Sequence, residues 1–316
     1  MNAFRFHILN AVILSIICMF TSLQTQADEL LAANLKKRAD AIVGLMSFML
    51  TPDVTTGSIA LSDEPTGNPD IALTTLGGGF TMSRDLPLYF EGTLGYSRYD
   101  PAFLASEGQV QRRVPTRWNS LSLTGGIGWD FPIAKELKFR PIFNFSYGRV
   151  ASDSAVAGTI LEDQTGADFE FLKNGTLDVY GLGGTLMLDY ERYRDENEID
   201  IELRYTNIQL KSFSDAPEAV QGSSHAQSLS LWARWRAPTG FTALDKPVRY
   251  VLEAARTSYI GDMRGALGFD DLNSIGVGLE LDSSAREIFI TRSRLIFRYK
   301  FGKNVEGTSV SFAISF

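Results

Sequence analysis

His225 is the residue of this sequence best suited to acid–base chemistry, because the other histidine, His7, lies close to the start of the chain. A histidine next to a serine can serve as the general base of a hydrolase, with the serine hydroxyl as nucleophile. The nearest serines in sequence are Ser223, Ser224 and Ser228. A histidine between a loop and a strand is, however, more often a surface residue. Our main hypothesis is therefore a non-enzymatic protein, and hydrolysis through His225 is the alternative.

The sequence predicts no catalytic residue, no metal and no cofactor. Closed zinc sites draw mainly on cysteine and histidine, and Cys18 is the only cysteine. The glycine clusters at 77–79 and 181–184 do not open a helix after a strand, as phosphate-binding loops do, and are more typical of bends in a curved sheet. An excess of acidic over basic residues, 37 against 30, argues against a nucleic-acid partner.

Charged residues alternate with apolar residues in several segments, so that the charges share one face of a strand. Leu137, Phe139 and Phe143, for example, oppose Lys138 and Arg140. The charges that we expect to point into the interior of a closed sheet are Arg140, Glu202, Arg204, Arg234, Glu253, Glu280, Arg292, Arg294 and Arg298. Basic groups outnumber acidic groups in this set. The excess fits an anion-selective lumen or an interior that holds a plug, and cross-strand ion pairs that only solvate the interior explain it equally well.

Long amphipathic strands are needed to position these charges. Segments with a period of two, separated by turn residues, occur about twelve times along the chain. They cover 54–61, 71–82, 86–96, 118–131, 137–150, 176–190, 198–210, 226–237, 248–259, 272–281, 286–301 and 307–316. Strands of globular proteins average about five or six residues, whereas a strand that crosses a bilayer needs about nine to eleven. The lengths favour an all-β fold, a transmembrane antiparallel β-barrel of about twelve strands, over a soluble sandwich.

The connections between these segments alternate in length. Turns such as 83–85 and 132–136 are short, whereas 99–117 and 151–175 are long. Outer-membrane barrels place short turns in the periplasm and long loops outside the cell. The alternation therefore predicts an orientation for the barrel, although the short connection 302–306 breaks the rule.

Residues 1–27 have the features of a signal peptide, which predicts export. One basic residue, Arg5, precedes an apolar run, and small residues before Asp28 form a cleavage site. The apolar run is too short for a transmembrane helix, and no later segment approaches the required length of about 20 residues.

The end of the sequence resembles the C-terminal insertion signature of bacterial outer-membrane β-barrels. Val310, Phe312, Ile314 and Phe316 alternate with small residues, and Phe316 is the last residue. The resemblance implies a multi-pass protein of the Gram-negative outer membrane. Its expected partners are outer-membrane lipid and the insertion machinery, which would contact the C-terminal strand, and we expect a monomer.

The segment 28–52 precedes the first strand and has helical periodicity over Glu29–Leu50, which ends before Pro52. An amphipathic helix directly before a barrel of this size resembles the translocator β-domain of bacterial autotransporters, in which such a helix lies in the lumen. The resemblance implies that 28–52 is a possible lumen plug for the barrel 53–316, which would be a passive or plugged pore. No room is left for a passenger, so we expect a solitary barrel.

Two alternatives to this interpretation stay open. The helix can instead lie outside the pore, at the membrane interface or in the periplasm. The hydrolase hypothesis can be compared with outer-membrane phospholipases, which carry a His-x-Ser-Asn-Gly motif. The sequence from His225 to Leu229 lacks both the spacing and the Asn-Gly pair.

Overall fold

A computed structural model describes most of the chain after residue 38. The described residues are 39–41, 43–50, 58–63, 68–100, 102–107, 110–115, 118–152, 176–213, 221–283, 291–303 and 305–315. The predicted signal peptide 1–27, the beginning of the predicted helix and Phe316 lie outside these ranges. The side chain of Ile314 also lies outside the described part.

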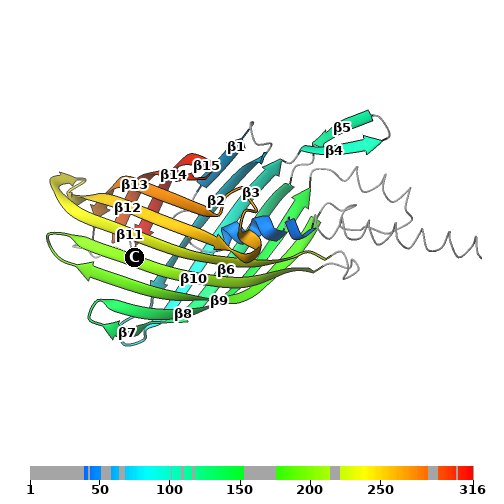
Figure 1. The fold of residues 1–316 in the computed structure, drawn as a ribbon. Helices are drawn as coiled ribbons and strands as arrows, with labels where there is room; N and C mark the ends of the chain where they lie inside the picture. Colours follow the sequence, from blue (N-terminus) through cyan, green and yellow to red (C-terminus); the bar gives the residue numbers. More distant parts are fainter. Residues whose placement is uncertain are drawn as a thin grey trace, which may run out of the picture.

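A single antiparallel sheet dominates the structure, and its main strands pair in chain order. They are β1 (Ser58–Asp63), β2 (Asn68–Thr81), β3 (Leu88–Asp100), β6 (Trp118–Trp129), β8 (Leu137–Ser152), β9 (Thr176–Tyr193), β10 (Glu198–Phe213), β11 (Ser223–Ala243), β12 (Lys246–Ile260), β13 (Asp271–Asp282), β14 (Arg292–Gly302) and β15 (Val305–Ser315). Each overlaps one predicted segment, so the predicted all-β fold of about twelve strands is confirmed. The short β7 (Phe131–Ala134) pairs with β8. A separate hairpin of β4 (Ala102–Glu107) and β5 (Val110–Pro115) projects from the loop between β3 and β6 (Figure 1).

The sheet curls around a hollow, and its first and last strands come next to each other (Figure 1). Within the described residues, no hydrogen-bonded ladder joins β1 to β15. The start of β14 pairs with the end of β15, through Arg292 and Ser315. The chain therefore ends at the edge of the barrel that carries the short turns, which we call the short-turn end, and the opposite edge is the loop end.

The outer face of the barrel is apolar over most of its height. Alternation along the strands is regular, and β10 shows it with buried even-numbered and exposed odd-numbered residues over most of its length. Large apolar side chains are exposed around the barrel, among them Leu123 at 61% and Phe312 at 65%. A continuous exposed apolar surface of this kind is unfavourable in water and matches the hydrocarbon region of a bilayer. The outer face is therefore suited to contact with lipid.

A short helical segment precedes the barrel and lies inside the hollow near the loop end (Figure 1). Residues 39–41 and 43–46 are helical and continue into the 3₁₀ turn η1 (Ser47–Met49). The predicted helix is thus confirmed in its second half, and η1 contacts β2, β3 and β11. Among the described residues, no helix has the length and apolar character needed to cross a bilayer.

Candidate functional site

The hollow of the barrel is filled by apolar side chains at the loop end. The helical segment contributes Val43, Met46, Phe48, Met49 and Leu50. They pack with wall and loop residues, which are Leu73, Trp118, Val150, Leu177, Val179, Ile208, Leu210, Ala226, Tyr259, Met263, Leu267, Phe269, Leu272 and Val305. We call this set the apolar plug. The sequence-based expectation of a polar interior is wrong at this end, because the strand ends there are apolar on their inward face as well.

Glycines of the barrel wall provide the space in which the helical segment sits. A Cβ atom at Gly148 would overlap Met46 Cε, and a Cβ atom at Gly95 would lie 2.5 Å from Met49 Cβ. Glycine lets another segment approach the strand backbone closely. The helical segment therefore rests directly on the backbone of β3 at Gly95, and at Gly148 of β8 the end of the Met46 side chain fills the space above the glycine.

Polar and aromatic contacts fix the position of the helical segment within the wall. Ser47 Oγ lies 3.1 Å from Ser224 Oγ of β11, and both hydroxyls are buried. The backbone N–H of Ser223 donates a hydrogen bond of 2.7 Å to Asp40 Oδ1. The ring of Phe48 lies 4.8 Å from that of Tyr259 on β12, centroid to centroid. These contacts hold one face of the segment against β11 and β12.

A charged chamber occupies the hollow toward the short-turn end. All nine predicted inward charges point into the barrel. Glu202, Arg234 and Arg292 are half-buried, whereas Arg140, Arg204, Glu253, Glu280, Arg294 and Arg298 are buried. Eight of the nine, all except Glu280, line a cavity of about 570 Å³. The structure therefore gathers residues from strands that are far apart in sequence into one chamber.

Two ion pairs of the chamber join strands that are separated by three other strands in the sheet. Arg204 of β10 binds Glu91 of β3 through two hydrogen bonds of 2.6 and 2.9 Å, although β6, β8 and β9 lie between these strands. Arg292 of β14 binds Glu198 of β10 through hydrogen bonds of 2.7 and 3.1 Å, and β11, β12 and β13 lie between them. Bidentate arginine–carboxylate pairs are the strongest of the common ion pairs. We call these two pairs the cross-lumen pairs, because they bridge the hollow.

The acidic partners balance the arginines that the sequence singled out. Arg298 donates two hydrogen bonds, of 2.8 and 2.6 Å, to Glu253. Arg140 binds Asp130 and lies 3.0 Å from Asp189. Of the interpretations left open by the sequence, this arrangement favours ion pairs between strands inside the barrel over an anion-selective lumen.

Sequence reasoning passed over several of these acids. Asp130 directly follows β6 and has the parity of the inward Ser122 and Thr124, so the alternation could have found it. Glu198 has the same parity as the predicted inward Glu202, so the alternation could have found it, and Asp189 could have been found in the same way on β9.

Gly126 makes room for the Glu91 carboxylate. A Cβ atom at Gly126 would lie 2.5 Å from Glu91 Cγ and 2.7 Å from Asn144 Nδ2. The same Asn144 nitrogen donates a hydrogen bond of 2.7 Å to Glu91 Oε1. Gly126 therefore allows Glu91 to lie flat along the wall and reach Arg204.

Gly126→Ala is expected to destabilise the barrel by about 1–3 kcal/mol, because the added methyl group separates buried polar partners. The free energy of unfolding, measured by urea titration in lipid vesicles, checks this. Gly78→Ala is the matched control, since no described atom lies within 4 Å of a Cβ at that outward position, and its effect should stay within about 0.5 kcal/mol. Equal effects of the two substitutions would contradict the role given to Gly126.

An exposed ion pair joins two neighbouring turns at the short-turn end. Arg194 donates a hydrogen bond to Glu136, and Tyr190 donates another, of 3.1 Å, to the same carboxylate. The hydrogen bond from Arg194 is the main reason why the pKa of the Glu136 carboxyl lies below its usual value. When folding lowers the pKa of a carboxyl, the carboxyl stabilises the folded state at any pH above its pKa in the unfolded chain. This stabilisation is lost as the pH falls through the lowered pKa of the folded state.

His225 does not form the arrangement that the hydrolase alternative requires. Its side chain is exposed on the outer face of β11, whereas Ser224 is buried on the inner face. Ser223 has the parity of His225, but within the described residues no hydrogen bond joins the two side chains. Ser228 has the same parity as Ser224 and pairs with the inward Tyr259. The recorded hydrogen bond of His225 is from its backbone N–H to Asp262 Oδ2, at 2.8 Å. Within the described residues, no group of three potential metal ligands was found.

The described part of the C-terminal signature faces outward. Val310 and Phe312 are exposed on the outer face of β15. Ile314 belongs to β15 by its backbone. Val310 and Phe312 therefore contribute to the apolar outer face at the short-turn end.

Comparisons with known proteins give structural neighbours but no family. No family model and no curated protein matches the sequence. The β domain of the Bordetella autotransporter BrkA is 12% identical, with 81% of this chain and 93% of that chain covered and a TM-score of 0.42. The translocator domain of autotransporter NalP from Neisseria meningitidis is also 12% identical, with coverages of 81% and 82% and a TM-score of 0.39. LpxR from Salmonella typhimurium is 10% identical, with coverages of 81% and 97% and a TM-score of 0.40. Sequence identities and TM-scores this low do not assign the chain to a family.

Proposed function

We propose that this protein is an outer-membrane β-barrel of the autotransporter translocator type whose lumen is closed by its own helical segment. The packing of residues 43–50 into the loop end of the barrel is the observation that supports this most directly. The apolar outer face supports placement in a membrane. Long loops lie outside the cell in outer-membrane barrels, so the plug would close the outer mouth. We further propose that β15 is the strand that the insertion machinery contacts.

Two barriers in series support a closed rather than a freely conducting lumen. The apolar plug excludes water and ions from the loop end, as hydrophobic constrictions do in gated channels. Below it, the cross-lumen pairs divide the chamber between β3, β10 and β14. Ions could therefore pass through the barrel only after the helical segment has moved.

A designed disulfide tests the position of the helical segment. Ser47→Cys combined with Ser224→Cys should form a disulfide, because the two hydroxyl oxygens are 3.1 Å apart and the side chains already face each other. The background should carry Cys18→Ser so that no other thiol is present. We expect nearly complete cross-linking in membranes, measured as a shift in gel migration that a reductant reverses.

The matched control pairs Ser47→Cys with Ser228→Cys. Ser228 lies four residues further along the same inward face of β11, which is roughly 14 Å away at about 3.4 Å per residue. This pair should stay reduced. Failure of the first pair to cross-link in a barrel whose migration still depends on heating, or equal cross-linking of both pairs, would disprove the plug.

A further inference from the structure

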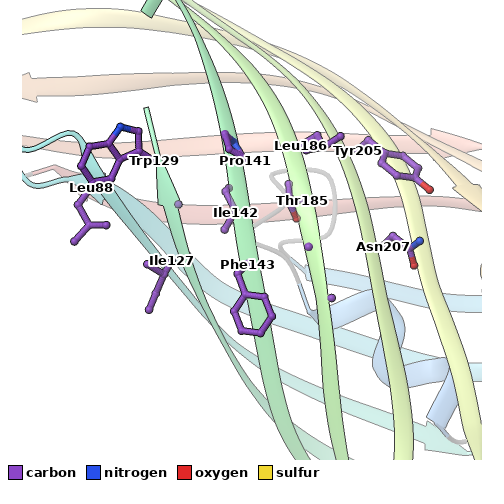
Figure 2. A pocket seen from close by; sticks show the side chains of 13 residues that line it. Leu88, Ile127, Trp129, Pro141, Ile142, Phe143, Thr185, Leu186, Tyr205 and Asn207 are labelled. Carbon is purple, nitrogen blue, oxygen red and sulfur yellow. The ribbon is translucent and has the colours of Figure 1, made fainter. Parts of the chain in front are cut away.

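A groove of about 670 Å³ runs over the outer face of the barrel between β6 and β10 (Figure 2). Ile127, Trp129 and Phe143 stand on one side of it, and Leu186, Tyr205 and Asn207 stand on the other (Figure 2). The groove lies within the apolar outer face, so the medium around it is lipid hydrocarbon. A hollow in this position loses dispersion contacts unless a chain fills it.

The sequence creates the groove by omitting side chains from its floor. Gly184 of β9 lies between Phe143 of β8 and Asn207 of β10 in the strand register. A Cβ atom at Gly184 would lie 3.0 Å from the carbonyl oxygen of Ile142, so the backbone surface is closely packed below the groove. The floor is therefore shaped by backbone, and its walls by larger apolar side chains.

A cluster of aromatic and basic residues lies above the groove, toward the loop end. Tyr180 pairs with Tyr147 on one side and with Lys211 on the other. The ring of Phe213 lies 6.2 Å from that of Tyr147 and 5.8 Å from that of Tyr180. Arg149 stands two residues beyond Tyr147 on the same outward face. We call these five residues the aromatic–basic rim.

The two cations of the rim are available to a ligand. Arg149 is 59% exposed, and its Nε lies 3.4 Å from Asp178 Oδ1. The same Asp178 oxygen accepts a hydrogen bond of 2.9 Å from the Tyr147 hydroxyl. Lys211 is exposed, and no carboxylate of the described residues lies within ion-pair distance of it. The rim and the adjacent Asp178 thus carry two cations and one carboxylate, which leaves a net positive charge.

We propose that the groove and the aromatic–basic rim together bind a phosphate-bearing lipid of the outer leaflet. Its phosphate would lie against Lys211 and Arg149, and one of its acyl chains would lie in the groove. Four residues separate Tyr180 from Gly184, which is about 14 Å along the strand. Half of the apolar band of an outer-membrane barrel is about 12 Å. When the phosphate of a lipid lies at the rim, its acyl chain is therefore long enough to reach the groove.

This inference goes beyond the plug and rests only on placement of the barrel in a membrane. Substitution of Arg149→Ala with Lys211→Ala tests the phosphate part, with bisphosphorylated lipid A as the probe. We expect at least a tenfold weaker retention of the probe, measured by native mass spectrometry of the purified full chain in detergent. Arg256→Ala with Lys303→Ala is the matched control, because Arg256 is also 59% exposed and also lies near one aspartate, Asp271. Its retention should equal that of the unchanged protein.

The groove is tested by Asn207→Trp, which places a large side chain into it from the outer face. Retention of bisphosphorylated lipid A should again fall about tenfold. Lipid A without phosphates should be retained by every variant as weakly as bisphosphorylated lipid A is retained by the double alanine variant. Heat-dependent gel migration verifies that each variant is folded, which separates loss of binding from loss of the membrane barrel. Equal retention in the rim, groove and control variants would overturn the proposal.

Discussion

Removal of residues 39–50 is expected to raise the conductance of the purified barrel in planar bilayers by at least tenfold. The deletion takes away every helical side chain of the apolar plug, among them Met46 and Met49, and so opens the loop end to water and ions. The strand ladder of the wall does not include these residues, so the barrel itself should persist. Dewetted apolar constrictions block ions until they are widened.

Gly148→Leu offers the same test with the chain intact. The new side chain would occupy the space of the Met46 side chain, so Met46 must leave its place in the apolar plug and the conductance should rise in the same direction. Gly78→Leu is the control, because that outward glycine faces open space among the described residues. Unchanged conductance of both plug variants, in barrels whose migration still depends on heating, would show that the apolar plug is not the barrier that limits conductance.

Arg204→Met is expected to lower the free energy of unfolding by about 3–5 kcal/mol, because it leaves Glu91 buried without its cation. The side chains of this cross-lumen pair are only 7% and 2% exposed. Replacing both partners, as Arg204→Met with Glu91→Leu, should restore most of the loss, since an apolar pair of similar volume carries no unpaired charge. Urea unfolding in lipid vesicles, followed by tryptophan fluorescence, measures all three proteins.

The exposed pair of Arg149 and Asp178 provides the comparison. Arg149→Ala should change the free energy of unfolding by less than about 1 kcal/mol, as is usual for surface ion pairs. A loss of that small size for Arg204→Met would show that the cross-lumen pair does not hold β3 and β10 together. A double variant as unstable as the single one would show that packing, rather than the unpaired charge, determines the cost.

The strands and the direction of their side chains could be predicted because both are local properties. Successive residues of a strand face opposite sides, so the alternation around Phe143 and Asn144 is enough to assign an outer and an inner face. Parity alone placed all nine charges inside. The alternation of faces continues near the loop end, but residues such as Val179 and Leu210 are apolar and face inward there, so hydrophobicity no longer distinguishes the lipid-facing side from the side that faces the plug.

The sequence by itself thus determined the strands, the apolar exterior and the inward charges, since each depends on neighbours along the chain. The tertiary structure decided which inward residues meet. Glu91 and Arg204 are 113 residues apart and come together only because the curled sheet brings β3 opposite β10. In the same way, Gly148 receives Met46 only after the helical segment enters the hollow. The curling of the sheet sets these distances, and no pattern of neighbouring residues in the sequence contains them.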